Sequence, residues 1–207
     1  MIPQFFIDRK LHNGLNYKQY IELTEKQISE TDDSKLSAEE KEIFEYTKLN
    51  LQRSSRIDRH YSVSDELSAK LNEIDKPQAW MVITENWCGD SAQNLPYLTK
   101  MAEVNSNVDL KILLRDEHPE IMDLYLTNGT KSIPVLVIFD EDGNELFKWG
   151  PRPKLAQQLI NQWKSEGIVK PELYEKLHLW YGRNRGKEIE NEMLELINNN
   201  YEVLSGN

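Results

Sequence analysis

The sequence contains a single cysteine, Cys88. One cysteine cannot form a disulfide within the chain, and it cannot build a cysteine-rich zinc site. The four histidines are scattered, and none has ligand spacing to Cys88 or to an acidic residue, so we expect no metal site. This cysteine usage predicts a reduced, cytoplasmic protein.

Long hydrophobic runs are also missing. The longest, such as Pro134–Phe139, fall far short of the about 20 residues that a membrane-spanning helix needs. Residues 1–14 have no apolar core and no small-residue cleavage pattern, so we expect no secretory signal. The 9 glycines and 8 prolines are too few for a collagen-like or linker-like chain.

Basic residues are fewer than acidic ones. The chain has 25 Lys and Arg against 35 Asp and Glu, a net charge of −10. This excess argues against general binding to nucleic acid or to an anionic membrane. With 39% hydrophobic residues, the chain can still build a substantial core.

Two patterns divide the chain. The first 75 residues show helical periodicity in three stretches: over 17–28, after a capping box at Ser37–Glu40, and after Ser64. Polar breaks at 31–34 and 53–59 separate them. From residue 79, apolar strands at 79–84, 108–114, 134–139 and 145–149 alternate with helices after residue 91, at 118–126 and at 153–163. Two more amphipathic helices follow at 171–181 and 187–197.

This order predicts a three-layer α/β/α sandwich. The first two strands should be parallel neighbours, and Asp142-Gly143 should turn a hairpin that adds an antiparallel edge. Helices should cover both faces, with 153–163 closing the core. We therefore expect an N-terminal helical extension at 1–59, a core at 60–166, and C-terminal helices packed on that core at 167–207.

Cys88 lies where the first core strand gives way to a helix. Free N–H groups and the positive end of the helix dipole at such a position favour a thiolate. The surrounding Trp87-Cys88-Gly89 resembles the Trp-Cys-Gly-Pro-Cys motif of the thioredoxin superfamily.

Further matches extend this resemblance over roughly residues 60–165. Pro96 falls where thioredoxins kink the helix, Ile133-Pro134 matches a pair whose proline is cis and faces the cysteine, and Gly150 follows the last strand. The segment 177–186 is similar to the tail of a bacterial group of thioredoxin-like proteins that carry N-terminal helices and a Trp-Cys-Gly-Asp-Ser motif.

Departures from the family pattern affect the chemistry. Ser91 replaces the second, resolving cysteine, so a mixed disulfide on Cys88 must be resolved by an external thiol such as glutathione. Val82 stands where thioredoxins have a buried aspartate that accepts a proton. Asp90, in place of the motif proline, favours the helix but disfavours a nearby thiolate by about 0.7–2.8 kcal/mol. The helix end contributes about 0.3–2 kcal/mol the other way, so the sign stays open.

The resemblance implies a monothiol thiol–disulfide oxidoreductase that acts in cell redox homeostasis. Cys88 would be the nucleophile, Ser91 would donate a hydrogen bond to the thiolate, and Asp90 would serve as an alternative proton acceptor. Substrate contacts would come from a shielding tryptophan, a glycine that permits close approach, and the rim before the cis proline: Trp87, Gly89, Ile133 and Pro134. The partner would be a protein thiol or disulfide, or glutathione as co-substrate, with no other cofactor.

Other interpretations remain open. The fold could serve as a non-catalytic binding module with a decayed site, or as a redox sensor whose oxidised Cys88 is read by a partner. The basic turn with Arg183, Arg185 and Lys187 could bind a phosphate or a glutathione carboxylate, or be a solvated break between helices. The oligomeric state and the cover of Cys88 by the flanking helices are not determined by the sequence.

Overall fold

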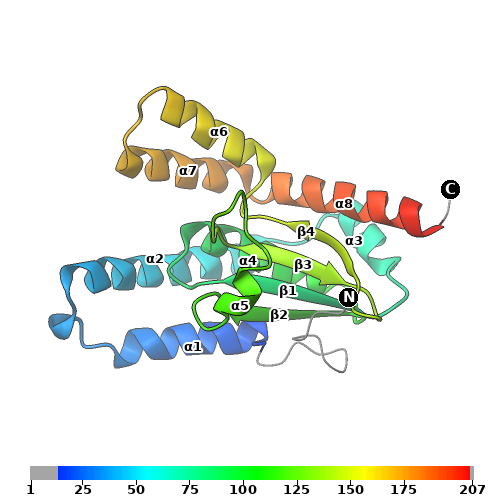
Figure 1. Cartoon of the computed structure of the whole chain (residues 1–207), viewed down its shortest axis with the longest axis horizontal. Helices are drawn as coiled ribbons and strands as arrows, with labels where there is room; N and C mark the ends of the chain where they lie inside the picture. Colours follow the sequence, from blue (N-terminus) through cyan, green and yellow to red (C-terminus); the bar gives the residue numbers. More distant parts are fainter. Residues whose placement is uncertain (1–13, 206–207) are drawn as a thin grey trace.

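The computed structural model describes residues 14–205, with side chains up to residue 200. Residues 1–13, nearly all of the segment in which no secretory signal is expected, lie outside this part. The elements follow the order α1 (Tyr17–Glu30), η2 (Asp33–Lys35), α2 (Ala38–His60), α3 (Asp65–Asn72), β1 (Gln78–Thr84), α4 (Gly89–Ala102), β2 (Val108–Leu114), α5 (Pro119–Met122), β3 (Val135–Phe139), β4 (Glu145–Trp149), α6 (Lys154–Ser165), α7 (Lys170–Asn184) and α8 (Lys187–Ser205) (Figure 1).

A four-stranded mixed sheet forms the centre, in the order β2-β1-β3-β4. β1 pairs with β2 in parallel, with Val82 opposite Ile112, whereas β3 runs antiparallel to both β1 and β4. The predicted parallel pair and the hairpin are therefore confirmed. The right-handed crossover through α4 places the N-terminus of that helix at the carboxyl end of β1.

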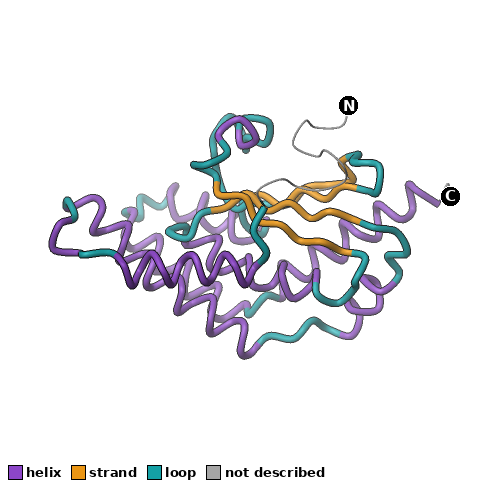
Figure 2. The backbone as a smooth tube through the Cα atoms, turned by 90° about the horizontal axis from the view of Figure 1, so that it is seen from below, coloured by secondary structure: helices purple, strands orange, loops and turns teal. Residues whose placement is uncertain are grey.

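The two faces of the sheet are covered unequally. Trp80 and Val82 point to one face, where they join a core cluster with α1, α2, α3, α4 and α8. Met81 and Ile83 point to the other face, which is covered by α5 and the segment after it. Figure 2 shows the sheet edge-on, with most helices below it and one short helix above. The α/β sandwich is present, but its second helical layer is thin.

The prediction of a polar break at 53–59 is wrong, because α2 continues through these residues to His60. Ser54 and Ile57 are buried on the side that packs on α4, and the Ser54 hydroxyl donates to the carbonyl of Ala92 at 3.3 Å. The segment is polar because its other sides face solvent. The predicted capping box at Ser37 and Glu40 is present at the start of this helix.

The helix that was expected to close the core, at 153–163, does not do so. Helix α6 packs on α7 in a separate cluster that includes Ile160 and Leu177, rather than closing the core. Helix α8 closes the core instead, through Ile189, Met193 and Ile197. The α6–α7 pair therefore lies beside the sheet, as Figure 1 shows, and positions α7 near the start of α4. The helix expected over 118–126 is a single turn, α5.

No helix in the described part of the chain is long and apolar enough to cross a membrane. Within the same residues, no group of three His, Cys, Asp or Glu side chains is placed to hold a metal ion.

Candidate thiol site

Cys88 is the N-cap residue of α4, with extended backbone dihedral angles. Its side chain is half-buried, and its Sγ lies 3.4 Å from the carbonyl oxygen of Ile133, to which the thiol can donate. The Ile133-Pro134 peptide bond is cis, as the family resemblance implies. The end of β1 and the segment before β3 thus bring Cys88, Ile133 and Pro134 together.

Gly150 maintains the position of this proline segment. Its φ of 121° lies in a region that side chains rarely adopt, and a Cβ atom on it would lie 2.2 Å from the carbonyl oxygen of Pro134. Only glycine allows the chain after β4 to approach Pro134 this closely.

The immediate surroundings raise the pKa of the Cys88 thiol. Burial is the largest cause, and the negative charge of Asp90 adds to it. The Ser91 hydroxyl and the backbone N–H groups of Asp90 and Ser91 act in the opposite direction but do not outweigh burial. The Ser91 hydroxyl is buried and has no hydrogen-bond partner within normal distance in the described chain, so it remains available to a thiolate. The resting thiol is therefore protonated at neutral pH.

Asp90 is held by two side chains from later in the chain. Arg152 donates from Nε to Oδ2 at 3.0 Å and also donates from Nη2, and the Tyr181 hydroxyl donates to Oδ1 at 2.6 Å. Arg152 is oriented by Gln157, and the side-chain amide of Asn94 donates to the Tyr181 oxygen. Both oxygens of Asp90 are therefore engaged, which opposes the proton-acceptor role considered for it.

His178 reaches the motif from α7. A Cβ atom on Gly89 would lie 2.9 Å from the His178 ring, so this glycine gives room to the imidazole as well as to a substrate. Burial, with the positive charge of Arg53, lowers the pKa of His178 to about 4, and its Nδ1 lies 3.4 Å from the amide nitrogen of Gln93. His178 is therefore a neutral imidazole beside the motif at neutral pH.

Two further ionisable groups, Glu85 and Tyr20, lie near the thiol. Glu85 is buried at the end of β1, accepts a hydrogen bond from the backbone of Asp116 at 2.9 Å, and has a pKa raised chiefly by burial. Burial also raises the pKa of Tyr20, from α1, and the charges of Cys88 and Glu85 add to this effect. The sequence interpretation did not single out either residue, because nothing in the motif links α1 to the end of β1.

A cavity of about 520 Å³ opens above Cys88. Its walls come from the motif, from α2 and α7, and from the segments after β2 and before β3. The flanking helices therefore form walls and leave the thiol partly accessible. Trp87 lies at the floor, half-buried, with the Arg115 guanidinium 4.8 Å from its ring centre.

The charges that line this cavity are mostly positive. Four cationic side chains and two carboxylates face it: Arg115, Lys131, Arg152, Lys170, Glu42 and Asp90. Lys131 pairs with Asp123 at 2.7 Å and Arg115 with Asp116 at 2.8 Å. Lys170 makes no ion pair within the described residues and lies 5.7 Å from the Tyr174 ring centre. The entrance is thus locally basic in a chain whose net charge is −10.

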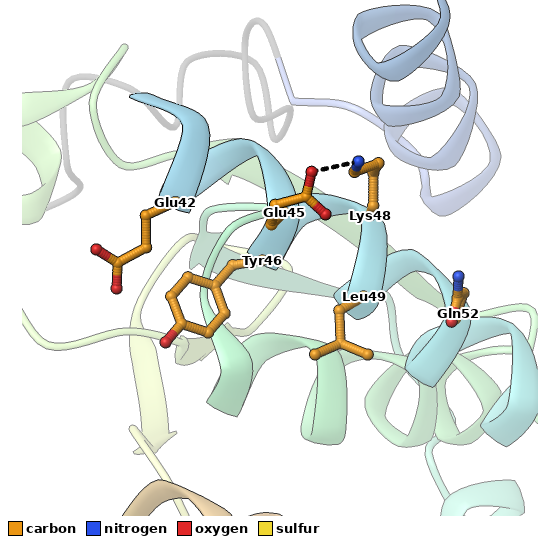
Figure 3. Close-up of a pocket in the computed structure, with 6 residues that line it drawn as sticks. All are labelled: Glu42, Glu45, Tyr46, Lys48, Leu49 and Gln52. Atoms are coloured by element: carbon orange, nitrogen blue, oxygen red, sulfur yellow. Dashed lines mark hydrogen bonds and ion pairs between the residues drawn. The ribbon is translucent and has the colours of Figure 1, made fainter. Parts of the chain in front are cut away.

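A shallower hollow lies on the outer side of α2 (Figure 3). All of its lining side chains come from this one helix, and two of them, Glu42 and Tyr46, also line the cavity above the thiol. Figure 3 shows Glu45 turned toward Lys48, with which it forms an ion pair. This hollow is a continuation of the cavity rim.

The thioredoxin family profile matches residues 37–164. The chain belongs to the thioredoxin family. No curated protein matches it. Among solved structures, it is similar to an HIV epitope scaffold, with 17% identity and a TM-score of 0.54 over 90% of this chain and 94% of that one. It is also similar to a protein of unknown function from Pseudomonas aeruginosa, with 16% identity and a TM-score of 0.50 over 89% and 98%.

The thioredoxin match includes part of the site and omits another part. Cys88, Pro134 and Gly150 fall inside it, as does Arg152, whereas α7 with His178 and Tyr181 lies beyond its end. The sequence signals for α7 were the amphipathic pattern at 171–181 and the similarity of 177–186 to the tail of a bacterial group. Neither indicated that this helix touches the motif.

Proposed function

We propose that this thioredoxin-family protein carries out thiol–disulfide exchange through Cys88 alone, on protein or glutathione mixed disulfides. The observation that carries the proposal is the sulfur of Cys88 at the floor of an open cavity, 3.4 Å from the Ile133 carbonyl oxygen. An extended substrate that donates an N–H to this carbonyl would take the place of the thiol hydrogen. The substrate disulfide would then lie next to the sulfur.

The exchange needs one external thiol. The Cys88 thiolate attacks one sulfur of the substrate disulfide, forms a new S–S bond, and releases the other sulfur as a thiolate that takes up a proton. Ser91 cannot resolve this mixed disulfide. An external thiol such as glutathione therefore attacks it and restores the free Cys88 thiol. The net reaction converts the substrate disulfide and one thiol into a new disulfide and a free thiol.

The charges of the cavity support an anionic disulfide as substrate. Glutathione carries two carboxylates, and Arg115, Lys131 and Lys170 face the space above the sulfur. The exposed rings of Tyr46 and Tyr174 offer additional contact area at the rim. We place this activity in the cytoplasm of a bacterium, because the chain has a single cysteine and because residues 177–186 are similar to the tail of a bacterial group of thioredoxin-like proteins.

Release of glutathione from a glutathionylated peptide, with reduced glutathione in excess, tests the proposal. We expect the wild-type chain to accelerate release and Cys88→Ser to fall to the uncatalysed rate. Wild-type protein alkylated at Cys88 serves as a control with an unchanged sequence. A Cys88→Ser variant that keeps the full rate would overturn the assignment.

A binding module is the second candidate. Its support is twofold. The raised pKa of Cys88 leaves the thiol protonated, and the hydrogen bonds from Arg152 and Tyr181 occupy the Asp90 oxygens that could have accepted its proton. Under this function, a partner is retained by Cys88→Ala with unchanged affinity. Under thiol exchange, the partner is held in a mixed disulfide with Cys88, and this complex is lost in Cys88→Ala and when a reductant is added.

A further inference from the structure

A second cavity, of about 500 Å³, lies farther along α7 than the thiol cavity, at the C-terminal end of that helix. It is enclosed by the end of α2, the middle of α4 and the turn between α7 and α8. Its polar lining is basic and aromatic: Arg56, His60, Tyr61, Gln93, Tyr97, Tyr181 and Arg185. No carboxylate lines it within the described part of the chain, although the chain as a whole is acidic.

Two arginines, Arg56 and Arg185, line this cavity together with Tyr97. Burial and the negative charge of Glu190 raise the pKa of Tyr97, whereas the positive charges of Arg56 and Arg185 act in the opposite direction. Glu190 is the acidic group near them, and its carboxylate accepts hydrogen bonds from the Tyr61 hydroxyl and from the backbone of Ser64. Neither guanidinium forms an ion pair with a carboxylate among the described residues. The cavity therefore has two exposed guanidinium groups in its lining, neither of which is paired with a carboxylate in the described part of the chain.

The backbone of the turn holds Arg185 in an unusual conformation. Arg185 ends α7 with φ 53° and ψ 37°, the left-handed region that usually takes glycine or asparagine. The next residue, Gly186, packs on Tyr97 so closely that a Cβ atom would lie 2.3 Å from the ring. A long cationic side chain thus occupies a position that a glycine would fill with less strain. Strain of this kind is often retained at binding sites.

We propose that this cavity binds a small organic phosphate that carries a ring, of about the size of a nucleoside monophosphate. Forked guanidinium groups match the oxygens of a dianionic phosphate. The cavity is much larger than a bare phosphate, and two aromatic side chains, Tyr61 and Tyr97, form an edge-to-face pair in its wall, with centroids 4.5 Å apart. The ring of the ligand packs against this pair while its phosphate lies between Arg56 and Arg185.

Calorimetric titration of the full chain with AMP, inorganic phosphate and adenosine tests the site. We expect AMP to bind about tenfold more tightly than phosphate or adenosine, since only AMP uses both the cations and the rings. Equal affinity for AMP and phosphate would overturn the role of the rings. Absence of AMP binding at millimolar concentration would overturn the site.

Matched variants separate this site from general surface charge. Arg56→Gln and Arg185→Gly each should weaken AMP binding about tenfold or more. The controls are Arg59→Gln, on α2 like Arg56, and Arg183→Gln, in the last turn of α7; both lie outside the cavity lining and should change AMP binding less than about twofold. Arg185→Gly should also keep or raise the melting temperature, because glycine relieves the left-handed strain. Equal weakening by all four variants would show that AMP responds only to net charge.

Discussion

At the scale of single residues, the pairing of Asp90 with Arg152 limits how far Asp90 raises the pKa of Cys88. Asp90→Asn removes the negative charge and leaves Arg152 unpaired beside the sulfur. We expect this variant to lower the pKa of Cys88, because a nearby negative charge is lost and a positive one is left without a partner. Arg152→Gln should raise that pKa, since Asp90 then acts on the thiol without a counter-charge.

The rate of alkylation of the native protein as a function of pH measures these shifts. Because Cys88 is the single cysteine, the whole signal belongs to it. The wild-type midpoint should lie above the ordinary value of about 8.5. The midpoint of Asp90→Asn should be lower than that of the wild type, and the midpoint of Arg152→Gln should be higher. Asp109→Asn, exposed on β2, is the control. A midpoint well below 8.5 in the wild type would contradict the described environment.

Gly150 and Gly129 form a natural pair for testing the close approach to Pro134. Both have a positive φ, but an added Cβ atom meets the Pro134 carbonyl at Gly150 and nothing within 4 Å at Gly129. Gly129→Ala should cost about 1 kcal/mol of unfolding free energy, from its backbone conformation alone. Gly150→Ala should cost at least about 2 kcal/mol more, because the backbone must move. Urea unfolding measures both values, and equal costs would show that the contact is easily relieved.

At the scale of elements, α7 contributes a neutral histidine to the site. The pKa of His178 is about 4 in the folded chain and about 6.5 when unfolded. This depressed pKa stabilises the fold fully above pH 6.5, and the contribution is lost as the pH falls toward 4. We expect the unfolding free energy of the wild type to drop by about 1–3 kcal/mol more than that of His178→Gln over this range.

Urea unfolding at pH 7 and at pH 4.5 tests this expectation. Lys176→Gln, on the same helix, is the control and should follow the wild type. If His178→Gln shows the same pH dependence as the wild type, the imidazole gains its proton without penalty and is more exposed than described.

The elements also show what the sequence could predict. The strands and the capping box at Ser37 were predicted because apolar runs and caps are local signals. The continuation of α2 through 53–59 was not, because a helix that buries only Ser54 and Ile57 there looks like a polar break until α4 is known to cover it. Nearly all of α4, including Gln93 and Asn94, is buried because α2 and other helices pack on it.

At the scale of the whole molecule, the site divides into a local and a non-local part. Cys88, Ile133 and Pro134 were expected together because the motif, the strand order and the family resemblance all place them at one end of the sheet. Tyr181 and His178 were not expected there, because they reach the motif only through the α6–α7 pair. Contacts between residues about 90 positions apart leave no periodic pattern in a single sequence.

The whole-molecule charge leads to one more prediction, because the net charge and the cavity charge have opposite signs. The net charge of −10 repels a dianionic disulfide reagent such as Ellman's reagent, whereas Arg115, Lys131 and Lys170 at the cavity attract it. Exposed charges act over about 10 Å at moderate salt, so we expect the cavity to decide the rate. The rate of reaction with Cys88, relative to neutral dithiodipyridine, should therefore fall as salt is raised.

Lys170→Gln should lower this rate ratio at low salt, and Lys164→Gln, exposed on α6 and outside the cavity lining, should leave it within about 20% of the wild type. A ratio that rises with salt would mean that the net charge dominates at the thiol. An anionic substrate such as glutathione would then have no electrostatic advantage, and the proposed preference for glutathione mixed disulfides would lose its support. A falling ratio that depends on Lys170 would instead locate the attraction at the rim that faces Cys88, where a bound disulfide must lie for the sulfur to reach it.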